Sequence, residues 1–125
     1  MTGTESGRFA PKVPIQLAPP KDDLITVEEL AKCDGTDPNR PIYVAIKGIV
    51  FDVTRNTAYG PDGQYKVFAG KDASRALACS SLKPEMCKPE WYDLEEKDKK
   101  TLDDWFTFFS KRYNIVGKVK DAKNF

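Results

Sequence analysis

The 125-residue sequence lacks histidine altogether and has three cysteines, almost no net charge and no long hydrophobic run. Without histidine, no mechanism that needs a histidine general base is available. Cys33, Cys79 and Cys87 are odd in number and form no CxxC pair, so they match neither the disulfide framework of a small secreted domain nor a zinc site. They favour a reducing compartment, and a single bridge with a spare thiol is the alternative.

The charges of the chain nearly cancel, with 20 Lys and Arg against 19 Asp and Glu. No long-range field is therefore available to hold nucleic acid or an anionic membrane. No segment approaches the ~20 apolar residues that span a bilayer, and the first residues contain no apolar run of signal-peptide length. We expect no nucleic-acid partner and no transmembrane segment, so any membrane association would be peripheral, through a partner or the N-terminal arm.

The composition, 40% hydrophobic over 125 residues, supports one compact core. Residues 1–23 are rich in Pro, Gly, Ser and Thr and predict a flexible arm, because Pro19-Pro20 cannot enter regular structure. The folded domain is predicted over residues 24–120, and residues 121–125 form a C-terminal tail.

Short predicted helices and strands follow the arm. Thr26 and Glu29 have the spacing of a capping box, and Val27, Leu30 and Ala31 fall on one side of the helix that it begins. Residues 42–46 and 49–54 are rich in β-branched and aromatic residues and predict a hairpin that turns at residues 47–48.

Further along the chain, Asp72 can cap a helix over residues 73–80. Residues 82–96 contain two prolines and predict irregular chain with at most a turn of helix. A closing strand is predicted at residues 115–119. The elements mix α and β without a βαβ rhythm, which predicts the α+β class.

The strongest periodic pattern lies in residues 98–114. Apolar side chains recur there at steps of three and four, which places on one helix face Leu102, Trp105, Phe106, Phe109 and Tyr113. A stripe of this kind is typical of a core. The charged run at residues 95–100 is a candidate partner surface, although a solvated helix start is the favoured interpretation.

The segment YGPDGQYKVFAGKDASRALA, residues 59–78, places Tyr59 and Tyr65 on either side of a Pro-Asp-Gly turn. Both tyrosines could be rim residues with packed rings and solvated hydroxyls. The glycines favour a sharp turn or a close backbone approach instead. Val67, Phe68 and Leu77 would give the loop an apolar wall, and an apolar pocket with polar groups at its mouth is the usual form of a cofactor site.

The blocks GIVFDVT, YGPDGQY, FAGKDASRALA and KRYNIVGK together resemble the membrane-associated progesterone receptor family of cytochrome b5-like haem- or steroid-binding domains. The resemblance covers residues 24–118 and is closest to the fungal damage-response branch, which lacks the transmembrane anchor of the animal members. It implies a cytochrome b5-like fold, in which a small mixed sheet and short helices form a haem pocket.

The resemblance also implies a haem b whose five-coordinate ferric iron is held by tyrosinate. Typical cytochrome b5 proteins hold the iron between two histidines, which this chain lacks. The branch that it resembles uses a tyrosine instead, and the resemblance places that ligand at Tyr65. A bound cation can make a phenolate at neutral pH, and catalase provides the chemical analogue. Tyr59 and Lys71 match residues near the ligand and the propionates, Arg112 matches a propionate partner, and Tyr113 matches a residue that hydrogen-bonds the ligating phenol.

The sequence differs from the family pattern at three places in or just after this loop. Gln64 stands where many members have proline, Ala76 stands where animal members have glycine, and residues 55–58 are one residue short of theirs. None of these changes removes a ligand, but they bear on haem affinity and steroid selectivity.

The function implied by the resemblance is regulatory rather than enzymatic. It is the binding and regulation of haem-thiolate monooxygenases of sterol biosynthesis, such as sterol demethylase, at the cytosolic face of the endoplasmic reticulum. A haem-independent steroid or lipid carrier using the same pocket is the alternative, and a redox enzyme is the weakest interpretation. An exposed haem face would also allow haem-dependent homodimers.

Overall fold

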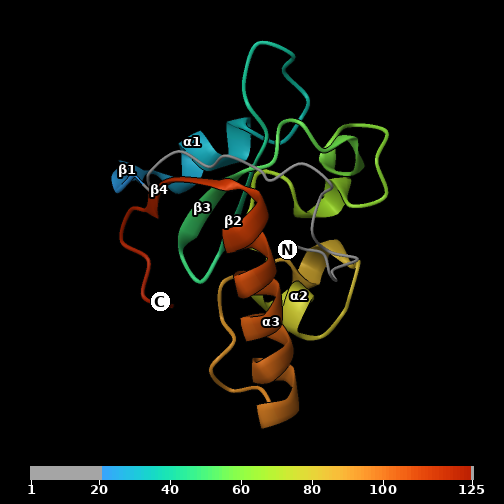
Figure 1. The fold of residues 1–125 in the computed structure, drawn as a ribbon, viewed down its shortest axis with the longest axis vertical. Coiled ribbons are helices and arrows are strands. Elements are labelled where there is room, and N and C mark those ends of the chain that lie inside the picture. The colour runs from blue at the N-terminus through green and yellow to red at the C-terminus, as the bar shows by residue number, and fades with distance from the viewer. Residues whose placement is uncertain (1–20, 125) are drawn as a thin grey trace, which may run out of the picture.

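The computed structural model describes residues 21–124, in which a four-stranded sheet carries helices on both faces (Figure 1). Most of the predicted arm, residues 1–20, lies outside the described residues. The strands stand in the order β1 (Asp23–Ile25), β4 (Asn114–Val119), β3 (Ile49–Asp52) and β2 (Tyr43–Ile46). β1 runs parallel to β4, and the other neighbours are antiparallel. This mixed sheet confirms the predicted α+β class.

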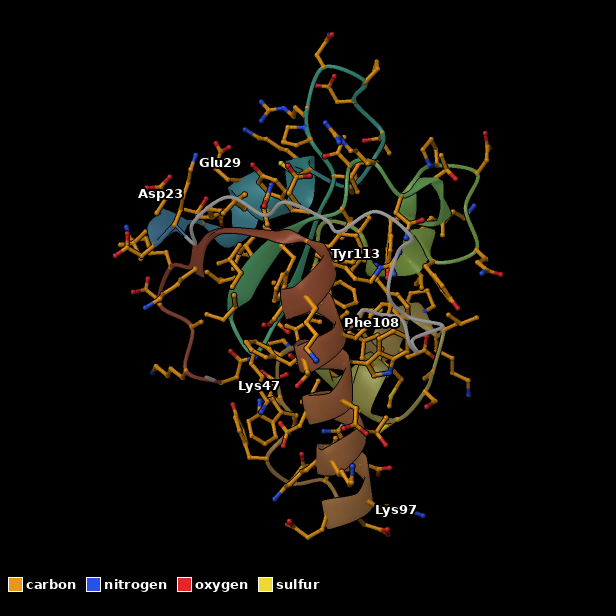
Figure 2. All side chains as sticks on the ribbon, in the orientation of Figure 1. Asp23, Glu29, Lys47, Lys97, Phe108 and Tyr113 are labelled. Carbon is orange, nitrogen blue, oxygen red and sulfur yellow. The ribbon has the colours of Figure 1, made fainter. Side chains whose placement is uncertain are left out.

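The predicted hairpin is formed by β2 and β3. Ile46 pairs with Ile49, and the two turn residues Lys47 and Gly48 have φ values of 53° and 77°. Positive φ at both positions belongs to the type I′ turn, whose twist matches that of the strands. The Lys47 side chain, labelled in Figure 2, extends from this turn. Its ammonium lies 4.7 Å from the ring centroid of Trp91 and forms an ion pair with Asp103, so two side chains contact the turn.

The strand β1 has no counterpart among the predicted elements. It exists through pairing with β4, where a Cβ on Gly117 would lie 2.3 Å from the carbonyl oxygen of Asp23. Only glycine permits this approach. β4 also carries a bulge against β3, because Val50 pairs with Gly117 while Phe51 pairs with Ile115. The sequence pattern of residues 23–25 contains no signal for so distant a partner.

The helix α1 (Val27–Lys32) begins as predicted, with the Glu29 amide donating to Thr26 Oγ1 over 3.0 Å. The predicted buried face is wrong in two of its three positions. Leu30 is buried, but Val27 is 61% exposed and Ala31 is also exposed. The short helix reaches the sheet through Leu30 alone, in a small cluster with Ala45, Val50 and Val119.

The helix α2 (Ser74–Ala78) is shorter than predicted at both ends. Asp72 nevertheless supports its first turn, because its Oδ1 accepts from the Ser74 amide over 3.0 Å and from the Ser74 hydroxyl. The chain leaves the helix at Ser80, whose φ of 52° is left-handed. The following irregular segment contains one short helical turn, η4 (Pro84–Met86), as predicted.

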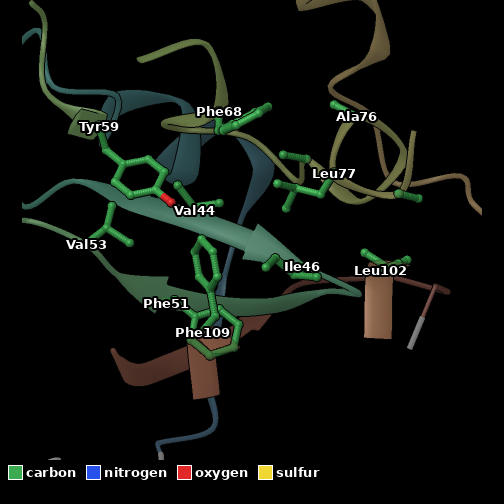
Figure 3. Close-up of a cluster of buried hydrophobic side chains, with 12 residues drawn as sticks. Val44, Ile46, Phe51, Val53, Tyr59, Phe68, Ala76, Leu77, Leu102 and Phe109 are labelled. Atoms are coloured by element: carbon green, nitrogen blue, oxygen red, sulfur yellow. The ribbon is translucent and has the colours of Figure 1, made fainter. Parts of the chain in front are cut away.

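The long helix α3 (Glu96–Arg112) places the aromatic stripe against the sheet. Leu102 and Phe109 are fully buried, and the other three stripe residues are half-buried. The Phe51 ring meets the Phe109 ring edge-on, with 5.4 Å between centroids, at the centre of the main core (Figure 3). The core prediction for this helix is confirmed.

Candidate functional site

The loop between β3 and α2 brings its two tyrosines together through its own backbone. It contains two short helical turns, η2 (Thr57–Tyr59) and η3 (Lys66–Phe68). The Tyr65 amide donates to the Ala58 carbonyl over 2.7 Å. A Cβ on Gly63 would lie 2.1 Å from that same carbonyl oxygen, so the loop closes only with glycine there. The ring centroids of Tyr59 and Tyr65 are consequently 5.7 Å apart.

A cavity of about 240 Å³ opens beside these rings. Its walls come from the loop, from α2 with the residues after it, and from α3. They are Tyr59, Tyr65, Phe68, Ala76, Leu77, Ser80, Ser81, Leu82 and Trp105. The lining is mainly apolar and contains no charged side chain. Leu82 is 55% exposed, so apolar surface continues from the cavity to its rim.

Tyr65 is the more accessible of the two tyrosines. Its ring is half-buried and stacks on Phe68, with 5.8 Å between centroids and 24° between planes. Among residues 21–124, its hydroxyl makes no hydrogen bond. The stack fixes the orientation of the ring beside the cavity.

Tyr59 is buried, at 3% exposure, and contacts α3. Its ring meets Phe109 edge-on at 6.0 Å and Tyr113 edge-on at 6.3 Å between centroids. Tyr59 and Tyr113 share a side-chain hydrogen bond, and Asn56 Nδ2 donates to the Tyr113 hydroxyl over 2.8 Å. Burial, with smaller contributions from Tyr113 and Tyr65, raises the pKa of Tyr59 far above its ordinary value. Tyr59 is therefore a neutral group that supports the site from behind.

The structure brings half of the predicted site residues to this cavity. Tyr59, Tyr65, Phe68 and Leu77 line it. Tyr113 does not line the cavity, but it is hydrogen-bonded to Tyr59, which does.

The other three predicted residues lie elsewhere. The Val67 carbonyl faces Cys87 Sγ at 3.5 Å. Lys71 lines a different cavity, and the Arg112 guanidinium lies 5.2 Å from the ring centroid of Phe108.

Sequence reasoning missed the site roles of several residues. Trp105 was assigned to the core stripe, but it also forms the α3 side of the cavity. Ser80, Ser81 and Leu82 carry no local pattern that predicts a pocket, because their position depends on how the chain leaves α2. Asn56 directly precedes η2, where its Oδ1 accepts from the Ala58 amide over 3.0 Å, and capping chemistry of this kind could have identified it.

The three thiols are not activated. Burial raises the pKa of Cys33, Cys79 and Cys87 above the ordinary value, which keeps them protonated at neutral pH. Within residues 21–124, no group of three or more Cys, Asp or Glu side chains is placed to share a metal ion. No helix in that range combines the length and apolarity needed to cross a bilayer.

Comparison with protein families gives a match over residues 26–88 to the model described as "Cytochrome b5-like Heme/Steroid binding domain". A solved Arabidopsis thaliana structure, described as having a cytochrome b5-like fold, superposes with a TM-score of 0.71 at 41% identity. That superposition covers 94% of this chain and 98% of the other. The cytochrome b5-like fold is thereby confirmed.

The named relatives are described as steroid-binding proteins or as a cytochrome P450 regulator. "Probable steroid-binding protein 3" of A. thaliana is 52% identical over 75% of this chain and 95% of its own length. "Membrane steroid-binding protein 2" of Oryza sativa is 45% identical over 77% of this chain, which spans 37% of that protein. "Cytochrome P450 regulator dap1" of Schizosaccharomyces pombe is 37% identical, over 75% of this chain and 61% of its length. These plant relatives are more similar in sequence than the fungal regulator.

Proposed function

Because the chain belongs to the cytochrome b5-like haem/steroid-binding domain family, we propose that it binds ferric haem through Tyr65 and regulates haem-thiolate monooxygenases. The observation that carries the proposal is the Tyr65 phenol, which lies in an apolar cavity with its ring stacked on Phe68 and its hydroxyl free of partners in the described residues. The whole chain has no histidine that could ligate the iron in its place.

We propose that haem lies across the mouth of the cavity rather than inside it. At about 240 Å³ the cavity is smaller than the roughly 300–1,000 Å³ of pockets that enclose drug-sized ligands. Phe68, Leu77 and Leu82 would provide the apolar contacts that hold the macrocycle. Bound haem would supply a ferric iron with one vacant coordination position, which suits ligand binding and regulation. If one face of the haem is left exposed, a second copy stacking on it would give the predicted haem-dependent dimer.

The side chains behind Tyr65 have positioning roles in this proposal. Tyr59 fills the space between Tyr65 and α3, and its hydrogen bond to Tyr113 keeps it fixed. Arg112 precedes Tyr113 at the end of α3, and we assign it to a propionate as the nearest match to the family pattern. Lys71 and Arg112 each line a different cavity from Tyr65, so the assignment of either residue to the propionate edge rests on the resemblance.

The partner class is supported by the name of the fission yeast relative, a cytochrome P450 regulator. A monooxygenase of sterol biosynthesis such as sterol demethylase, at the cytosolic face of the endoplasmic reticulum, is the partner that we propose. The names of the plant relatives favour a second candidate function, haem-independent steroid binding in the same cavity.

The absorption spectrum of the protein titrated with ferric haem tests the proposal. We expect a stoichiometric high-spin ferric spectrum with a phenolate charge-transfer band, and we expect Tyr65→Phe to lose that band. The matched control is Tyr59→Phe, which changes the neighbouring tyrosine and leaves the ligand in place. Free-haem spectra from all three proteins would exclude the haem function. Steroid binding that survives Tyr65→Phe would favour the second candidate.

A further inference from the structure

A cleft of about 1000 Å³ lies where the end of α3 meets the start of β4. Its lining residues fall in three ranges that are far apart in the sequence, residues 38–41, 52–57 and 112–114, and none of them lines the Tyr65 cavity. Tyr113 lines the cleft and is hydrogen-bonded to Tyr59, which lines the Tyr65 cavity, so this pair lies between the two. The volume of the cleft is at the upper end of the roughly 300–1,000 Å³ of small-molecule sites.

Positive charge gathers in this cleft. Each of the three ranges contributes one arginine: Arg40, Arg55 and Arg112. Asp52 is the one acidic residue of the lining, and its Oδ1 already accepts from the Thr54 amide over 2.9 Å and from the Thr54 hydroxyl. Three guanidiniums against one carboxylate leave an excess of two positive charges, in a chain whose formal net charge is +1. The cleft therefore favours an anionic ligand.

Two of the three guanidiniums are accessible to such a ligand. Arg55 is exposed and, among residues 21–124, forms no hydrogen bond or ion pair. Arg40 forms ion pairs with Glu29 over 3.7 Å and with Asp37 over 3.4 Å, and its side chain is 39% exposed. Exposed ion pairs contribute little to stability, so an anion in the cleft can replace these partners.

Arg112 and neutral donors complete the lining. The Arg112 guanidinium lies 5.2 Å from the ring centroid of Phe108, a contact that orients a guanidinium and leaves its charge. The Thr57 hydroxyl and the Asn39 side-chain amide also line the cleft, and neither makes a hydrogen bond within the described part of the chain. An anion here would accept from charged and neutral donors that come from all three ranges.

Donors that come from three separate ranges suit phosphate better than carboxylate. A phosphate monoester presents three acceptor oxygens and a charge of about −1.5 to −2 at neutral pH, whereas a carboxylate has two oxygens in one plane and a single charge. A guanidinium presents its donors in a planar fork that binds phosphate oxygens in pairs. Three such groups in a cleft of this volume have room for more than one phosphate.

We propose that this cleft binds a small molecule or lipid headgroup that carries two or more phosphate groups, whose oxygens accept from Arg40, Arg55 and Arg112. Haem is not required for this binding, because the cleft and the Tyr65 cavity have separate linings. Arg112 is also assigned to a haem propionate, so the test relies on Arg40 and Arg55, which have no part in the haem proposal.

Isothermal titration calorimetry of the full chain with inositol 1,4,5-trisphosphate tests the site. We expect saturable one-to-one binding. Arg55→Glu should weaken it at least tenfold, and Arg40→Gln should also weaken it, because each change removes a charge-assisted hydrogen bond. Lys97→Glu makes the same change of charge as Arg55→Glu, at an exposed position of α3 outside the cleft. It should leave the affinity within about twofold of the parent value, because exposed charges outside a site are screened.

Two further comparisons identify the ligand class. Phosphatidylcholine vesicles containing phosphatidylinositol 4,5-bisphosphate are compared with charge-matched vesicles containing phosphatidylserine. Binding specific to the phosphoinositide vesicles, and tighter than that of the free trisphosphate, identifies a lipid headgroup, whereas tighter binding of the free trisphosphate identifies a soluble ligand. Citrate, a tricarboxylate, should compete several-fold less well than the trisphosphate.

Three results would overturn the proposal: no saturable binding of either phosphate probe, equal losses in Arg55→Glu and Lys97→Glu, or equal competition by citrate. Haem titration of Arg55→Glu separates this site from that of Tyr65. An unchanged haem affinity supports a separate site, whereas loss of haem binding together with phosphate binding would make the cleft part of the haem site and would also overturn the proposal. Failure of phosphate binding alone leaves the haem proposal standing.

Discussion

Tyr59 and Tyr65 lie 5.7 Å apart between ring centroids, at opposite ends of one short loop, but only Tyr59 is sealed against α3. The loop sequence alone does not distinguish the two tyrosines, which stand on either side of one Pro-Asp-Gly turn. What separates them is the stripe of α3, because Phe109 and Tyr113 contact Tyr59 and leave Tyr65 facing the cavity. Tyr59 is therefore a buried, neutral residue of the core, and Tyr65 is the candidate ligand.

The burial of Tyr59 predicts a loss of stability at high pH. Its folded-state pKa is raised above the ordinary value, so the folded protein holds the proton when the unfolded chain has lost it. The free energy of unfolding therefore falls as pH rises above about 10, the ordinary tyrosine pKa. The slope due to one such group is about 1.4 kcal/mol per pH unit. Urea unfolding between pH 9 and pH 11.5 should show a shallower decline for Tyr59→Phe than for the parent protein, and equal declines would contradict the assignment.

Gly63→Ala should distort the loop much more than Gly60→Ala. The new Cβ would meet the Ala58 carbonyl at 2.1 Å, so the backbone must move and the hydrogen bond from Tyr65 to Ala58 must lengthen or break. We expect a loss of about 1–3 kcal/mol of stability and at least tenfold weaker haem binding. Gly60→Ala is the control, because its nearest contact is 3.3 Å from Thr57 O. Equal haem affinity in the two variants would show that the loop shape is not needed.

The sequence predicted the parts of the fold whose causes lie within a few residues. The capping box at Thr26, the hairpin turn at Lys47 and the stripe of α3 are local patterns, and each has the predicted structure. The strand β1 could not be predicted, because its cause is Gly117, more than ninety positions away. Val27 was misassigned for the same reason, since helical periodicity shows that a face is apolar but not whether any element covers it.

The residues of the candidate site also fall into those that local sequence predicts and those that it does not. The two tyrosines and Phe68 could be named from their loop, because a turn sequence keeps its own residues together. Arg112 could be named only by resemblance, and it does not line the cavity, to which α3 contributes Trp105. How α3 docks on the loop is not encoded in any local pattern.

Phe109 couples the core to the site, and its truncation should affect both. The side chain is fully buried and its ring contacts those of Phe51, Tyr59 and Tyr113. Phe109→Ala should cost about 3–5 kcal/mol of unfolding free energy, and it should also weaken haem binding, because Tyr59 loses its support. Phe108→Ala, at a half-buried position on the same helix, should cost less than half as much. Urea denaturation and haem titration of both variants provide the measurements, and similar costs would contradict the packing argument.

The C-terminal residues that the sequence assigned to a tail should contribute to stability through Asn124. Its side chain joins Asp72 to the Pro89 carbonyl, and its own carbonyl accepts from Trp91 Nε1 over 2.8 Å. Asn124→Ala would leave the Pro89 carbonyl without this donor and Asp72 with one hydrogen bond fewer, so we expect a loss of about 1–3 kcal/mol. Lys123→Ala, exposed one position earlier, is the control and should change stability by less than about 0.5 kcal/mol. If the urea midpoints of the two variants coincide, the hydrogen bonds of Asn124 contribute nothing measurable to stability, and residues 121–124 behave energetically as the tail that the sequence predicts.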